Sequence, residues 1–181
     1  MSRKARGFHT PRQFGRNQDG VAAVEFALLA PVMILLYFGM AELCQAHMAH
    51  KRMSHVTSMV ADLTARAQSL SRSELNDIFN IGNQVMQPFS PGPLETRVSS
   101  ITRDNTGVVR VDWSFARGMA PRTGTVVVPA GLINNGESLI MSESIYDYDS
   151  PVDRFLPTVT ELERTYYLRP RIVDKVICSD C

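Results

Sequence analysis

The chain has 181 residues, of which 44% are hydrophobic and 20% are charged, and this composition suits a folded protein rather than a disordered one. Its length allows one domain of ordinary size plus a membrane anchor. The net charge of +1 is unevenly distributed, because residues 1–20 carry five basic side chains against one acidic side chain. Such a tail before an apolar run is more typical of a topology signal than of a nucleic-acid-binding arm, so no nucleic acid is expected as a partner.

A long apolar run follows the basic tail. Residues 21–43 are interrupted by Glu25 near the start, and sixteen uncharged residues separate it from Glu42. At ~1.5 Å per residue this run is long enough to cross the ~30 Å of hydrocarbon in a lipid bilayer. Pro31 is tolerable as a kink if a neighbouring helix satisfies the freed carbonyl. We therefore predict a transmembrane helix over 21–43, with the basic N-terminus in the cytoplasm and the remainder exported.

The helical pattern continues over residues 44–68. Apolar residues recur there at alternating spacings of three and four, which is typical of a helix-packing seam. The seam residues are Ala46, Ala49, Met53, Val56, Val60 and Leu63, and the spacing continues to Ala67 and Leu70. A seam of this kind needs a partner, which is either another chain or the globular part of this chain.

The sequence "SRSE" at 71–74 is typical of a capping box and predicts a second helix over 71–86. Beyond a linker, the apolar period changes to two, which indicates strands. "DNTG" predicts a hairpin turn between 96–103 and 108–115. One face of that hairpin is expected to carry Val109, Val111, Trp113 and Phe115.

Further strands are predicted in 124–131, 137–150 and 171–177. The predicted fold class is therefore α+β. It consists of a long N-terminal transmembrane helix with a periplasmic extension, a second short helix, and a small antiparallel β-sheet domain over 94–181.

The chain has three cysteines. Cys44 ends the apolar run, and Cys178 and Cys181 form a CxxC motif. A thioredoxin-type site would place this motif at a helix start near a βαβ unit, and a zinc site would need two further ligands. The remaining alternatives are a structural disulfide, which an oxidising compartment would favour, or idle thiols.

Two groups of polar residues have side chains that could bind a metal ion. One consists of His47, His50 and His55. The other consists of Asp147, Asp149 and Asp153. The histidines lack a carboxylate at matching spacing, and the aspartates lack the glycine and distal glutamate of a calcium loop. We expect no metal and no cofactor, and because no nucleophile or nucleotide-binding motif is present, we expect no enzyme.

One short motif at the start of the apolar run carries a resemblance. Gly20 is followed by four apolar residues from Val21, then by Glu25 and Phe26, so that the glutamate is the fifth residue after the glycine. With the basic leader and the apolar run, this resembles the type IV prepilin pattern. Residues 19–65 resemble the TadE-like family, pseudopilins of the tight-adherence (Tad, Flp) pilus system.

The resemblance implies that a prepilin peptidase cuts after Gly20, so that 1–20 is a cleaved cytoplasmic leader. Cleavage would expose an amino group at Val21, one helical turn from Glu25. That amine, from the same or a neighbouring subunit, could offset the roughly 3 kcal/mol that an acidic residue costs at mid-span. Glycine lets the backbone enter a narrow peptidase cleft in an extended conformation. The alternative is an uncleaved anchor whose Glu25 extends to the cytoplasmic interface.

The resemblance also implies a function. The chain would be a non-catalytic minor pseudopilin of TadE or TadF type. It would lie in the bacterial inner membrane with its C-terminal domain in the periplasm, and it would either stay in that membrane or be incorporated into the pilus. It would take part in assembly of Flp-type pili, and through them in adhesion and biofilm formation. The implied partners are a prepilin peptidase, a second, TadF-like pseudopilin, the pilus assembly platform and the pilin. The alternative function is an uncleaved, single-pass, membrane-anchored periplasmic binding or sensor module.

Overall fold

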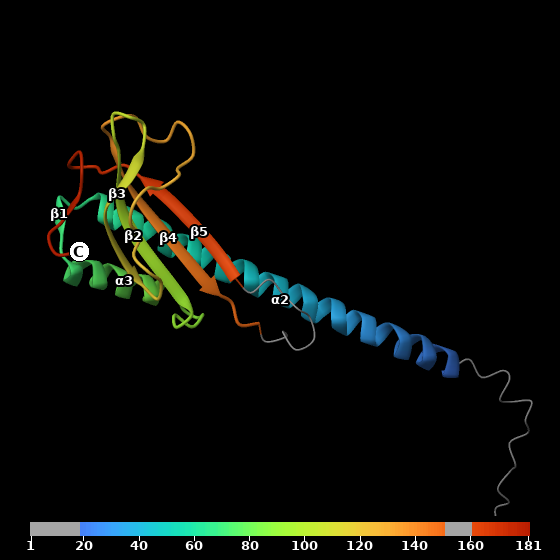
Figure 1. The fold of residues 1–181 in the computed structure, drawn as a ribbon. Helices are drawn as coiled ribbons and strands as arrows, with labels where there is room; N and C mark the ends of the chain where they lie inside the picture. The colour runs from blue at the N-terminus through green and yellow to red at the C-terminus, as the bar shows by residue number, and fades with distance from the viewer. Residues whose placement is uncertain (1–18, 151–160) are drawn as a thin grey trace, which may run out of the picture. The chain divides into compact units, whose positions relative to one another are not determined.

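A computed structural model describes residues 19–150 and 161–181 of the chain (Figure 1). Its longest element is helix α2, which runs without interruption from Asp19 to Ala65 and contains Pro31. The predicted membrane span and most of its predicted extension therefore form one helix. The chain divides into two compact units, Met1–Leu43 and Cys44–Cys181.

Helix α3, Arg72–Val85, begins at the predicted capping box. The backbone N–H of Ser71 donates to Glu74 Oε2 at 2.8 Å, and the backbone N–H of Glu74 donates to Ser71 Oγ at 3.4 Å. These two bonds satisfy amides that have no acceptor inside the helix. Both the capping box and the second helix are confirmed, with bounds one residue inside the predicted 71–86.

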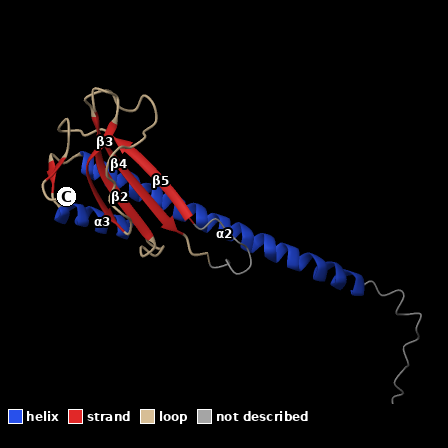
Figure 2. Cartoon of the chain, in the orientation of Figure 1, coloured by secondary structure: helices blue, strands red, loops and turns tan. Residues whose placement is uncertain are grey.

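Four strands form one antiparallel sheet in the order β3-β2-β4-β5 (Figure 2). The strands are β2, Leu94–Arg103; β3, Val109–Arg117; β4, Ser138–Asp147; and β5, Glu161–Leu168. Two short strands, β1 (Ser69–Leu70) and β6 (Ile177–Cys178), pair in parallel with each other. The predicted α+β class and the small antiparallel sheet are confirmed.

The larger core lies between one face of the sheet and the two helices. Met53, Val56 and Val60 of α2 are at most 1% exposed and share this cluster with side chains of α3, β2 and β4. Burying each such side chain stabilises the fold by about 1.5–3 kcal/mol. The two helices approach closely at Gly82 of α3, where an added Cβ would lie 3.0 Å from Val56 Cγ1.

A second, smaller core lies on the opposite face of the sheet. Ile101, Leu139 and Met141 from β2 and β4 pack there against Val126 and Ile133, which come from the connection between β3 and β4. Both faces of the central strands are therefore covered. This explains why β4 reads as an almost continuous buried segment rather than as an alternating one.

One prediction about the hairpin is wrong. Four apolar residues were expected on one face, namely Val109, Val111, Trp113 and Phe115. A β-bulge separates them, because Trp113 pairs with Ser100 whereas Val111 pairs with Ile101, which leaves Asp112 as the additional residue. A bulge of one residue reverses the face on which the following side chains lie. Trp113 accordingly packs on the larger core, and Val111 packs on the smaller one.

Two predicted strands are also wrong. In 124–131 only Thr125 forms a bridge, to Arg110, and Pro129 cannot donate to a ladder. In 171–177 only the last residue, Ile177, is in a strand. At the other end of this segment the Arg171 N–H donates to Ala65 O, at the end of α2, instead of to a neighbouring strand. Conversely, β5 was not predicted. It is an edge strand with no buried residue and three charged residues, and its apolar pattern is correspondingly weak.

Candidate functional site

The apolar part of α2 presents its side chains outward on all sides. Its most apolar stretch is long and apolar enough to cross a membrane, and none of that stretch is buried. The exposed side chains between 21 and 43 include Phe26 at 73% and Leu43 at 70% exposure. An exposed apolar surface of this size is typical of a segment that is covered by lipid or by another protein. One long apolar N-terminal helix of this kind fits a single-pass membrane anchor.

Gly20 lies in the first turn of this helix and is exposed. A Cβ added to Gly20 would meet no heavy atom within 4 Å, so packing does not require a glycine here. Glycine inside a helix costs about 0.5–1 kcal/mol relative to alanine. Gly39 is equally open, so openness alone does not distinguish Gly20. The distinguishing feature of Gly20 is the sequence that follows it.

Val21 and Glu25 are four positions apart on the same helix, so they lie on one face, about one turn apart. Val21 is 58% exposed, and Glu25 and Phe26 are exposed as well. The structure thus places the four predicted processing residues together on the first turns of one exposed helix. Nothing in the described part of the chain covers them.

The predicted helix-packing seam lies elsewhere. Ala49, Met53, Val56 and Val60 are buried in the larger core of the same chain, against α3 and the sheet. The two remaining seam residues, Ala46 and Leu63, are half-buried. Of the two partners that the sequence left open, the structure shows the globular part of this chain. The buried seam residues are therefore not available to pack against another subunit.

Glu42 was missed as a residue of interest. It is 4% exposed, and among the described residues neither of its carboxylate oxygens has a hydrogen-bond partner. An unpaired buried carboxylate is costly, so buried carboxylates usually have a positively charged or hydrogen-bonding partner. The only signal in the sequence is a second acidic residue at the end of an apolar run, and that pattern does not distinguish a buried side chain from an exposed one.

The remaining candidates lie apart from this segment. His47 and His55 are exposed and His50 is half-buried. Among the described residues, the one group with the proximity needed for a metal ion comprises Cys178, Asp180 and Cys181. Those two cysteines are joined in a disulfide, so they offer no thiolate. Asp147 and Asp149 are exposed, and Asp153 lies outside the described residues.

Comparison with protein families adds a separate observation. Residues 20–62 match the TadE-like protein family. The matched range begins at Gly20 and ends within α2, before α3 and the sheet. No curated protein and no solved structure matches the chain.

The TadE-like match associates the chain with Tad pilus systems, whose TadE-like components are generally structural proteins rather than enzymes. It contains all four predicted processing residues, the whole apolar stretch, and most of the part of α2 that contributes to the larger core. The sheet lies outside it.

Proposed function

We propose that this chain is a minor pseudopilin that a prepilin peptidase processes after Gly20 and that takes part in assembly of Tad/Flp type IV pili. In this proposal residues 1–20 are a cytoplasmic leader. The single pass over 21–43 stores the subunit in the bacterial inner membrane, and residues 44–181 face the periplasm. Adhesion and biofilm formation would follow from the assembled pili.

One observation carries this proposal: the TadE-like match begins at Gly20, a glycine for which the fold has no packing use. Packing within the described structure therefore does not account for a glycine at this position. A peptidase that must draw an extended backbone through a narrow cleft supplies a reason, because glycine has no Cβ. The exposed first turn of α2 supports this, since the site is open to a membrane enzyme.

The proposal gives the carboxylate of Glu25 a partner. Cleavage would free the amino group of Val21, which is one turn away on the same face and could equally come from a neighbouring subunit. In a low dielectric two opposite charges attract far more strongly than in water, which offsets much of the cost of burying the carboxylate. Such a pair would also fix the axial register between adjacent subunits.

Lateral packing between subunits is assigned to residues 21–43 rather than to the seam. The four buried seam residues are occupied by the core, whereas the apolar side chains of 21–43 are exposed. The proposed partners are a prepilin peptidase, a second, TadF-like pseudopilin, the assembly platform and the pilin. The sheet would supply the specificity of these contacts outside the bilayer.

Intact mass measurement tests the proposal. The full-length chain is purified from its host with and without an active prepilin peptidase. We expect a chain that begins at Val21 only when the peptidase is active. Gly20→Val should abolish that shortening. Gly39→Val is the matched control, because Gly39 is equally open within the same helix.

The contrary result is equally clear. If Met1 is retained in both preparations, the pseudopilin proposal fails and an uncleaved anchored periplasmic module takes its place. If Gly39→Val blocks processing as strongly as Gly20→Val, the effect arises from the helix rather than from the cleavage motif.

A further inference from the structure

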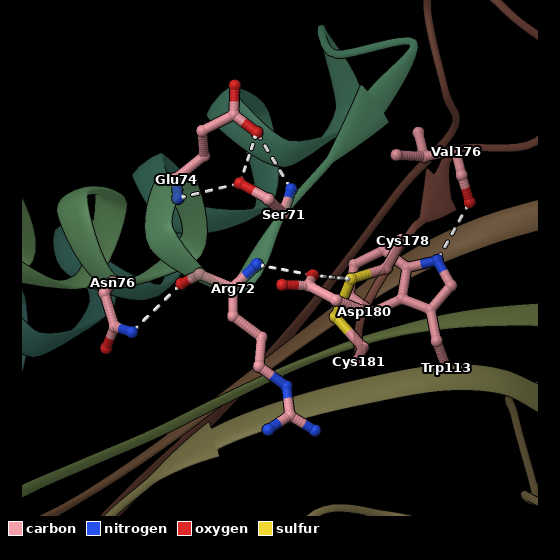
Figure 3. Close-up of a disulfide and its surroundings, with 9 residues drawn as sticks. All are labelled: Ser71, Arg72, Glu74, Asn76, Trp113, Val176, Cys178, Asp180 and Cys181. Atoms are coloured by element: carbon pink, nitrogen blue, oxygen red, sulfur yellow. Dashed lines mark hydrogen bonds between the residues drawn. A yellow bond between two sulfur atoms is a disulfide. The ribbon is translucent and has the colours of Figure 1, made fainter.

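The C-terminal segment Val176–Cys181, here called the clasp, contacts three elements that are distant from it in sequence (Figure 3). Its first contact is main-chain pairing. Strand β6 pairs in parallel with β1, and the Ser179 N–H donates to Leu70 O at 3.1 Å. This pairing places the clasp directly beside the start of α3, which begins at Arg72.

The second contact is at the N-terminus of α3. Asp180 Oδ1 accepts a hydrogen bond from the backbone N–H of Arg72 at 2.8 Å. Arg72 is the first residue of the helix, so its amide has no acceptor within the helix. Ser71 and Glu74 already form the local capping box, and Asp180 therefore satisfies a further amide from a distant part of the chain. A carboxylate at this position is also favoured by the helix dipole.

The third contact is with the sheet. Trp113 Nε1 on β3 donates to Val176 O at 2.9 Å, and Val176 is fully buried. Trp113 is the one tryptophan of the chain. Its fluorescence therefore reports on the start of the clasp without interference from another indole.

A disulfide between Cys178 and Cys181 closes a small ring that contains Asp180. Cys178 Sγ lies 3.8 Å from Asp180 Oδ1, which is a contact rather than a hydrogen bond, because a disulfide sulfur carries no proton. The ring restricts the backbone on both sides of Asp180. The position of the Asp180 carboxylate, and with it the hydrogen bond from the Arg72 N–H, is thus coupled to the oxidation state of the two cysteines.

We propose that Cys178–Cys181 is a site of reversible thiol–disulfide exchange that controls capping of α3. Cys181 is exposed and Cys178 is half-buried, so an external dithiol attacks Cys181 Sγ. The bond between the two sulfurs breaks, and Cys178 leaves with the electron pair and takes a proton. The second thiol of the dithiol then displaces Cys181, which also becomes a thiol, and the dithiol leaves as a disulfide. Once the ring is open, the Asp180 carboxylate is no longer held in position to accept the hydrogen bond from the Arg72 N–H.

The test uses the full-length chain in detergent micelles, with Cys44→Ser to remove the free exposed cysteine. Dithiothreitol is the reductant. Hydrogen exchange of the Arg72 amide is followed by NMR, and Trp113 emission is recorded on the same samples. We expect exchange at Arg72 to become roughly fivefold faster on reduction, as for loss of a helix cap. Trp113 emission should shift to longer wavelength, and both changes should reverse on reoxidation.

Two variants distinguish the clasp from a general loss of structure. Cys181→Ser should show the fast Arg72 exchange without reductant and should not respond to dithiothreitol. Asp180→Ala retains the disulfide but removes the acceptor, so Arg72 should exchange fast in both oxidation states. Exchange at Leu75, which is buried further along α3, serves as the control for global unfolding.

The proposal is overturned if Arg72 exchanges at the same rate in the oxidised and reduced chain. It is equally overturned if alkylation of the unreduced protein labels both Cys178 and Cys181, because the ring would then be absent. Reduction that accelerates exchange at Leu75 as much as at Arg72 would show unfolding of the helix instead of loss of its cap, and would also contradict it.

Discussion

Arg97 on β2 donates from Nε to Glu143 Oε2 on the adjacent strand β4 at 2.7 Å. Arg122, from the connection that follows β3, forms an ion pair with the other oxygen of the same carboxylate. Burial by itself would raise the pKa of Glu143, but the hydrogen bonds from the two arginines outweigh it and hold the pKa below its ordinary value. The cluster thus joins two neighbouring strands to the segment that covers the smaller core.

Glu143→Gln should destabilise the globular unit by about 2 kcal/mol, because two partly buried guanidinium groups lose a charged acceptor. Thermal unfolding of the full-length chain in detergent micelles measures the effect. Glu163→Gln on β5 is the control, since Glu163 is exposed and should change stability by less than about 0.5 kcal/mol. Equal effects of the two substitutions would contradict the role assigned to the cluster.

The turn between β2 and β3 predicts that the stability of the folded chain decreases at acidic pH. Asp104 Oδ1 accepts hydrogen bonds from the Thr106 hydroxyl and from the Val108 N–H, and these lower the pKa of Asp104 from 3.8 to about 2. Because the folded-state pKa is depressed, the stabilisation is fully present above pH 4 and is lost as the pH falls toward 2.

Asp104→Ala should therefore lower the melting temperature at pH 6 and flatten its decline between pH 4 and pH 2. The measurement is thermal unfolding across that range, followed by Trp113 emission. Asp174→Ala, at an exposed aspartate, should leave the profile unchanged. An Asp104→Ala profile as steep as that of the unmodified chain would show that other carboxylates determine the acid response.

The carboxylate of Glu42, which has no hydrogen-bond partner among the described residues, predicts a substitution that raises stability rather than lowering it. Glu42→Gln keeps the size of the side chain but removes a buried charge, so it should stabilise the full-length chain by about 1–3 kcal/mol at neutral pH. Glu25→Gln is the matched control, because Glu25 is exposed on the same helix. A lower melting temperature for Glu42→Gln would mean that the carboxylate has a favourable partner in the protein.

Sequence reasoning succeeded where the determining contacts are local. The capping box of Ser71 and Glu74 and the turn at Asp104 each involve groups fewer than five residues apart, so short patterns specify them. The long helix was equally predictable, because its apolar stretch and its periodic continuation need only a count of residues.

The β-bulge at Asp112 could not be predicted in this way. Its carboxylate bonds to the Thr102 hydroxyl on β2 and pairs with Lys175, far along the chain. The side-chain pattern of β3 alone predicts that apolar and polar side chains alternate between the two faces of the sheet. That Asp112 is an additional residue relative to β2 is seen only in its contacts with distant partners. Clasp contacts such as that of Asp180 with Arg72 depend on tertiary structure for the same reason.

The candidate site shows the same contrast between local motifs and tertiary contacts. Residues 20–26 form a linear motif, which a peptidase would recognise in an extended chain, so the sequence is sufficient to find it. The seam from Ala49 to Val60 has the period of a helix interface, but period does not identify the partner. The structure shows that these side chains contribute to the core of their own chain, where Gly82 allows α3 to approach.

The last prediction concerns Glu25 itself. Glu25→Ala removes an acidic residue from the apolar run, so membrane insertion should be unimpaired or improved. If the proposed charge pair exists, assembly should nevertheless fail, because the amino group of Val21, from the same or a neighbouring subunit, would lose its carboxylate partner. Cell fractionation measures insertion, and electron microscopy of surface pili measures assembly. Leu29→Ala is the control, since it alters an exposed residue one turn further along and leaves the charge pair intact. Normal piliation with Glu25→Ala would eliminate the charge-pair hypothesis while leaving cleavage after Gly20 to be judged by intact mass.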